Sequence, residues 1–225
     1  MLINIFREGG DAQTIFITLV AYICAILTAF TLHEFAHGFV AKLNGDDTAK
    51  LMGRLTLNPI KHLDPIGAIC LLVIGFGWAK PVPINSNNFK NFRKGLLTTS
   101  LAGVTTNLIL ALVFTGLYHL LGLVPTSSIS SEVVWIIYKL LLYFFVYSVM
   151  CNLVLMVFNL LPVFPLDGFR VLEALGGGKV RFIDKYIDFC RRSGGLVTVL
   201  MILAINYLGV LPAVVSFFLK LLHVA

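Results

Sequence analysis

Charge is scarce in this 225-residue sequence. Only 12% of the residues are Asp, Glu, Lys or Arg, and 58% are hydrophobic, whereas about a quarter of an average soluble domain is charged. The mean hydropathy is +0.93, which excludes an ordinary soluble domain and favours an integral membrane protein. The 4 cysteines are scattered and form no CxxC pair, so structural thiols are favoured over disulfides or cysteine metal sites.

Long runs without charge set the number of membrane segments. Four stretches carry no Asp, Glu, Lys or Arg, and each is long enough for the ~20 residues of a transmembrane helix: 12–32, 95–131, 140–166 and 193–219. They predict spans over 12–42, 96–122 and 134–161, followed by a helix or hairpin at about 194–222. The whole chain, 1–225, is predicted to form one integral-membrane domain.

A shorter apolar run, "PIGAICLLVIGFGW" at 65–78, does not fit this count. Basic residues lie on both sides of it, so a full crossing would place one basic cluster outside. We expect a re-entrant or extended membrane-associated segment around residues 50–90, a structure tolerated where protein shelters its backbone. The predicted fold class is an all-α polytopic membrane protein, a bundle of four to six transmembrane helices.

Basic residues predict the orientation of the bundle. They cluster after the first run, before the second, and between the third and fourth, whereas "VPTSSISSE" at 124–132 has none. By the positive-inside rule the basic loops are cytoplasmic. This accounts for the net charge of +6 without a nucleic-acid partner, and it predicts a multi-pass protein of the cell membrane.

The stretch "TLHEFAHGF" at 31–39 carries ionisable groups at the end of the first apolar run. Residues four apart share one helix face, so His33 and His37 present two imidazoles together, as zinc ligands do. Glu34 stands beside them, in the position of the general base of HExxH metalloproteases. Ionisable residues in membrane segments are unfavourable and usually mark function, so we predict a zinc site here.

A catalytic zinc ion usually has three protein ligands, and Asp167 is the best third candidate. It stands in "NLLPVFPLDGFR" at 159–170, at the same predicted depth as the histidines. Pro162 and Pro165 interrupt the helix there. The residues "PLDG" are also typical of an ordinary turn that ends a helix. The presence of the HExxH motif favours the interpretation of Asp167 as a metal ligand over this turn.

These motifs resemble those of the site-2 proteases, intramembrane zinc metalloproteases, in particular their compact prokaryotic type without extra domains. "HEFAH", "NLLPVFPLDGFR" and, less closely, "SLAGVTTN" at 100–107 carry the resemblance. It implies that His33, His37 and Asp167 bind one Zn²⁺ per chain and that Glu34 is catalytic. It also implies that Asn159 holds substrate or stabilises the oxyanion; a helix-to-helix hydrogen bond is the alternative for Asn159.

The predicted function is therefore intramembrane endopeptidase activity, in which peptide bonds in or near transmembrane segments are hydrolysed as in regulated intramembrane proteolysis. The expected partners are a transmembrane-protein or membrane-peptide substrate and the lipid bilayer. A regulatory membrane protein is a further candidate partner. The active site should face the cytoplasmic side. The alternatives are a zinc or divalent-metal transporter, although no internal repeat typical of transporters is visible, and a non-catalytic membrane scaffold.

Overall fold

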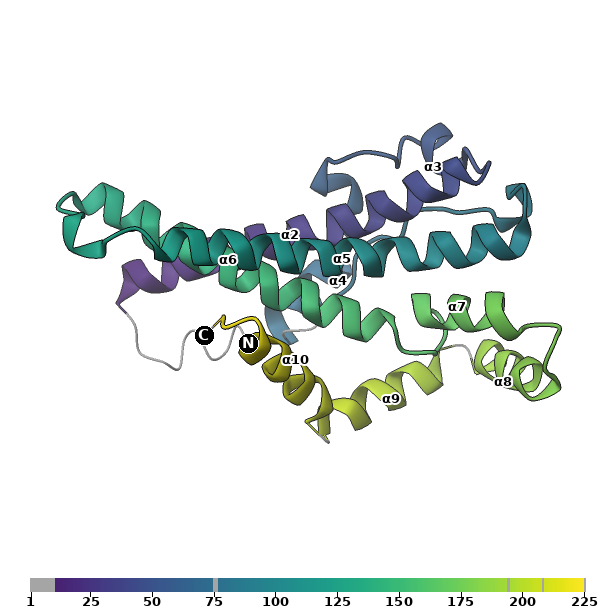
Figure 1. The fold of residues 1–225 in the computed structure, drawn as a ribbon. Coiled ribbons are helices and arrows are strands. Elements are labelled where there is room, and N and C mark those ends of the chain that lie inside the picture. The colour runs from purple at the N-terminus through teal and green to yellow at the C-terminus, as the bar shows by residue number, and fades with distance from the viewer. Residues whose placement is uncertain (1–10, 75–76, 194, 208, 225) are drawn as a thin grey trace.

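The computed structural model describes residues 11–74, 77–193, 195–207 and 209–224, and three long helices dominate it (Figure 1). They are α2 (Ala12–Leu43), α5 (Phe92–Gly122) and α6 (Glu132–Asn159). By length and composition these are the three helices in the described ranges that could cross a membrane. The described residues form no strand beyond one isolated bridge, so the predicted all-α membrane class is confirmed.

The ends of these helices follow from local sequence. The Asp11 carboxylate accepts a hydrogen bond from the Thr14 amide (3.1 Å) and caps α2, and the Asn91 side chain caps α5 through the Lys94 amide (3.0 Å). Such residues satisfy amides that have no partner within the helix. Helix α6 ends at Asn159, three residues before Pro162, because proline disrupts helix continuation.

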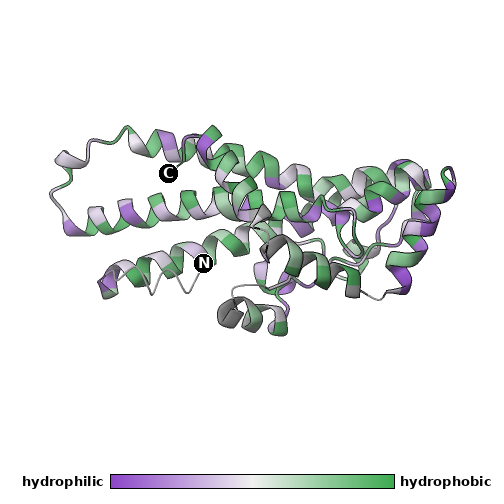
Figure 2. Ribbon diagram, turned by 90° about the horizontal axis from the view of Figure 1, so that it is seen from below, coloured by the Kyte–Doolittle hydropathy of each residue, from purple (hydrophilic) through white to green (hydrophobic). Residues whose placement is uncertain are grey.

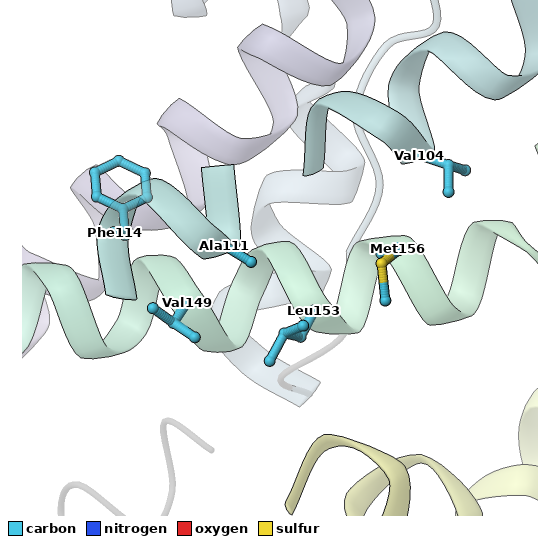
Figure 3. Packing of buried hydrophobic residues seen from close by; sticks show 6 residues of the cluster. All are labelled: Val104, Ala111, Phe114, Val149, Leu153 and Met156. Carbon is cyan, nitrogen blue, oxygen red and sulfur yellow. The ribbon is translucent and has the colours of Figure 1, made fainter. Parts of the chain in front are cut away.

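The three long helices pack against one another side by side (Figure 1). Ala21, Ala25 and Ala29 repeat every fourth residue on α2 and are fully buried, which allows close helix approach. Between α5 and α6 the core is built from apolar side chains of mixed size (Figure 3): Val104, Ala111 and Phe114 on one helix, and Val149, Leu153 and Met156 on the other. Hydrophobic residues cover much of the bundle, and polar ones gather at the end that carries α7 and α8 (Figure 2).

The chain between α2 and α5 folds back on itself. It contains α3 (Thr48–Leu51), two 3₁₀ turns and α4 (Pro65–Ile74). After α4 it returns, because Ala79 forms an antiparallel bridge with Leu63 and the Lys80 amide donates to the His62 carbonyl (2.8 Å). Both ends of the 65–78 run therefore lie together, as a re-entrant segment requires.

The last part of the chain consists of four short helices: α7 (Asp167–Gly176), α8 (Arg181–Arg192), α9 (Leu196–Tyr207) and α10 (Val210–Leu221). The predicted helix or hairpin at 194–222 is thus two helices of 12 residues each. At 1.5 Å per residue each is about 18 Å long, shorter than the ~30 Å hydrocarbon core. Gly209, with φ of 64°, is the N-cap residue immediately before α10, and this left-handed conformation favours glycine.

Candidate metal centre and active site

His33 and His37 lie on the face of α2 that points into the bundle. Their side chains are buried, with 4% and 6% exposure. The two Nε2 atoms are 3.0 Å apart, and the rings meet nearly edge to face. The spacing of four residues therefore places both imidazoles on one face, as the sequence predicts.

A chain of amides fixes which nitrogen of His33 carries a proton. Asn152 donates to the Ser148 carbonyl (2.8 Å), so its side-chain oxygen is left to accept from the Asn107 amide (2.8 Å). The Asn107 oxygen must then accept from Nδ1–H of His33. Nε2 of His33 is consequently left with a lone pair.

A backbone carbonyl fixes the protonated nitrogen of His37. Its Nδ1 lies 2.7 Å from the Thr99 carbonyl oxygen on α5, which can only accept, so Nδ1 carries the proton. Both neutral imidazoles thus direct an unprotonated Nε2 toward the same point. Such partners of the outer nitrogen orient histidine ligands in metal sites.

Asp167 completes the group at the start of α7. Its Oδ2 atom lies 3.3 Å from Nε2 of His33 and 3.1 Å from Nε2 of His37. The non-helical stretch between α6 and α7 lets the chain turn back, so this carboxylate points at the imidazoles rather than into solvent. The structure therefore brings together the three residues that the sequence singles out as ligands.

The donor set fits a metal ion. Oδ2 of Asp167 is buried and has no hydrogen bond, because neither Nε2 atom has a proton to give it. Three buried lone-pair donors at mutual distances of 3.0, 3.1 and 3.3 Å repel one another unless a cation lies between them. Tetrahedral ligands 2.0–2.1 Å from zinc are about 3.3–3.4 Å apart, which is close to these separations.

Gly103 of α5 lies directly against the two imidazoles. A Cβ atom at this position would be 2.4 Å from Cε1 of His33 and 2.5 Å from Nε2 of His37. Glycine is therefore required here for steric reasons, since α5 must approach closely enough for Thr99 and Asn107 to reach the imidazoles.

Glu34 is held by an extended segment that crosses α2. Its Oε2 atom accepts a hydrogen bond from the Val82 amide (2.7 Å). Val82 lies between two prolines, so its N–H is the one backbone donor that positions 81–83 can offer. The segment is anchored at its ends by Arg54, which donates to the Lys80 carbonyl (2.7 Å), and by the Asp46 carboxylate, which accepts from the Asn85 amide (2.7 Å).

Asn159 lies at the end of α6, and its side-chain amide donates to the Leu155 carbonyl (3.0 Å) of the same helix. The structure shows no substrate, so the role that the resemblance implies for Asn159 stays a prediction.

The sequence reasoning missed the residues around the ligands. Asn107, Asn152 and Thr99 orient the imidazoles, and Gly103 provides their space. Two of them carried a usable signal, because Asn107 and Asn152 are amides inside long charge-free runs. Buried polar side chains in such runs need partners, but a single sequence does not say which ones.

The comparison with family models decides the family. Residues 21–201 match the model described as Peptidase family M50. The chain belongs to peptidase family M50. This match covers both the histidine motif and Asp167, and it confirms the resemblance to site-2 proteases together with the predicted enzyme class, a zinc metalloprotease.

Similar proteins agree with this assignment. "Putative zinc metalloprotease YwhC" of Bacillus subtilis is 47% identical over 156 residues, which is 68% of this chain and 68% of the relative. "Putative zinc metalloprotease Rip2" of Mycolicibacterium smegmatis is 30% identical over 152 residues, 65% of this chain and 54% of the relative. The protein of the same name from Mycobacterium tuberculosis is 32% identical over 160 residues, covering 68% of this chain and 56% of the relative. No solved structure was found to match the chain.

Proposed function

We propose that this M50 peptidase is a multi-pass protein of the cell membrane that hydrolyses peptide bonds in or near transmembrane segments of membrane proteins, as in regulated intramembrane proteolysis. His33, His37 and Asp167 hold one Zn²⁺, and Glu34 is the general base. The observation that carries the proposal is the convergence of three buried lone-pair donors beside a carboxylate, inside a bundle of apolar helices.

The chemistry follows from the donor set. His33, His37 and Asp167 would hold a zinc ion, which would supply Lewis-acid chemistry: polarisation of a peptide carbonyl and a pKa of water lowered to about 7. Glu34 takes the proton of the attacking water and returns it to the departing amine. Its Oε2 atom is engaged by the Val82 amide, which leaves Oε1 to carry the proton.

The placement of the site supports access from the cytoplasmic side. The centre is built from the second half of α2, the first half of α5 and the start of α7, and the basic loops lie at that end of the bundle. A cavity of about 190 Å³ adjoins it. Thr99, Ser100 and Arg170 line this cavity together with apolar residues such as Phe89 and Phe169, and we propose that water approaches the centre from it.

The extended segment offers a place for the substrate. A transmembrane helix must unwind before its carbonyls can be attacked, and an unwound strand pairs well with an extended edge. We propose residues 81–86 as that edge, next to Glu34, extended as far as the 3₁₀ turn Ser86–Asn88. The Val82 and Asn85 amides are held by Glu34 and Asp46, so the pairing would use the Ile84 amide and backbone carbonyls. Replacing 81–86 by a flexible Gly-Ser linker should then abolish cleavage with metal content unchanged; full activity of this variant excludes the pairing.

The test of the function uses purified protein in lipid vesicles with a membrane-embedded reporter peptide. Glu34→Gln is expected to retain the metal and lose cleavage, and Asp167→Ala to lose both. Glu132→Gln, the same chemical change at an exposed position at the start of α6, should alter neither. Turnover by Glu34→Gln at the rate of the unchanged protein would remove Glu34 as the base, and full metal content in Asp167→Ala would remove the third ligand.

A further inference from the structure

Helix α8 carries two separate apolar sets. The inner set contains Ile187 and Cys190, which are buried and pack against Phe169, two residues after Asp167. The outer set is Phe182 and Phe189, whose side chains are 78% and 59% exposed. One side of α8 thus packs against α7, and two aromatic rings on its other side are exposed.

The outer face alternates aromatic and basic residues. Phe182, Lys185, Phe189 and Arg192 follow one another at spacings of three, four and three, so they share one helix face, and all four are exposed. Two other charges of this region are already engaged: Arg191 pairs with Glu173 (2.6 Å), and the Asp184 carboxylate accepts from the Gly178 amide (2.7 Å). Asp188 is also exposed on α8, three residues after Lys185 and four before Arg192. The outer face therefore combines two aromatic rings and two basic side chains, with one acidic side chain at its edge.

The position of α8 differs from that of the exposed apolar residues on the three long helices. Exposed side chains on α2, α5 and α6 belong to helices long enough to span a bilayer, but α8 has 12 residues and is rich in charge. It lies at the end of the bundle where α5 begins, and it runs across the direction of the long helices: Figure 1 shows it nearly end-on and Figure 2 from the side. An interfacial helix lies in this way, parallel to the membrane surface.

We infer that the face formed by Phe182, Lys185, Phe189 and Arg192 docks on the anionic lipid surface of the membrane that holds the bundle. The two rings enter the headgroup region, and the two basic side chains bind lipid phosphates. This inference rests on the proposed membrane orientation, which places α8 at the cytoplasmic leaflet, the leaflet rich in anionic lipids. The bilayer is favoured over a soluble partner because the spans already hold α8 at its surface.

The experiment uses the full chain with Phe189→Trp as its single tryptophan, with Trp78 and Trp135 replaced by phenylalanine. The protein is placed in vesicles of phosphatidylcholine alone or mixed equally with phosphatidylglycerol. Brominated lipid chains, which quench tryptophan on contact, report the depth of position 189. The measurement needs neither metal nor cleavage, so its failure is separate from a failure of the peptidase proposal.

Docking predicts blue-shifted, quenched emission in the anionic vesicles and weaker quenching in neutral ones. Lys185→Gln together with Arg192→Gln should lower the ratio of docked to undocked helix by about fivefold per charge removed, and about 1 M salt should have a similar effect. Lys42→Gln together with Lys50→Gln removes the same charge from exposed positions on α2 and α3 and should change nothing.

Three results would overturn the inference. Unquenched emission in anionic vesicles would place the rings in water. Equal quenching in neutral vesicles, unaffected by loss of the two charges, would show contact with lipid chains that needs no anionic headgroup. Emission that changes with the protein-to-lipid ratio, without quenching by bromine, would show that a second copy of the chain covers the face.

Discussion

Gly103→Ala tests whether the two imidazoles are held where the structure places them. The added methyl carbon would lie 2.4 to 2.7 Å from three imidazole atoms of His33 and His37. The favourable separation for such contacts is about 3.5–4.0 Å, so the overlap is about 1 Å. Either α5 moves away or the imidazoles turn.

Neither movement leaves the centre intact. Nδ1 of His33 is bound to Asn107 and Nδ1 of His37 to Thr99, and both partners lie on α5 with Gly103. Overpacking of this kind typically destabilises by about 1–3 kcal/mol, and disturbed partners of metal ligands lower metal affinity about 10–100-fold. A 10–100-fold loss of metal affinity corresponds to about 1.4–2.8 kcal/mol, which is similar in size to the overpacking energy.

The assay is metal retention by the purified variant during dialysis against a chelator of known affinity, followed by cleavage of the reporter peptide. Gly116→Ala is the matched control, because Gly116 is on the same helix and a Cβ there would meet nothing within 4 Å. It should gain up to ~1 kcal/mol of stability from the better helix former and keep its metal. If Gly103→Ala holds metal as tightly as Gly116→Ala does, the close packing of α5 on the imidazoles is refuted.

Three further changes probe the surroundings of the centre. Asn107→Leu removes the acceptor for His33 and should weaken metal affinity about 10–100-fold, measured by chelator competition; unchanged affinity would contradict the amide chain. Gly38→Ala places a methyl group 3.1 Å from Cγ1 of Val82 and should shift the Val82 amide away from Glu34. Cleavage should then slow less than tenfold with metal content unchanged. Loss of the metal in this variant would contradict an effect confined to Glu34. Burial raises the pKa of Asp46, but hydrogen bonds from its neighbours outweigh burial and hold the pKa below 3.8. The ionised carboxylate therefore stabilises the fold above pH 3.8, and this stabilisation is lost as the pH falls through the lower pKa of Asp46 in the folded protein. The unfolding temperature of the unchanged protein should thus fall more steeply below pH 4 than that of Asp46→Asn.

The sequence alone determined the three long helices and half of the centre. Runs without charge must either span the bilayer or be buried, so α2, α5 and α6 begin and end within four residues of the predicted spans. The pairing of His33 with His37 is equally local, since four residues make about one helical turn.

Tertiary structure decided everything that joins distant parts of the chain. The turn of Asp167 toward the imidazoles, rather than an ordinary helix end, depends on how α7 packs on α5. The contact between His33 and Asn107 joins residues 74 positions apart, and the hydrogen bond from Val82 to Glu34 spans 48. Periodicity describes neighbours along one helix, and it holds no information about which face of a second helix meets them. The packing of the whole bundle determines which helix faces meet. The absence of a side chain at Gly103 is part of that packing, because it lets α5 approach the two imidazoles.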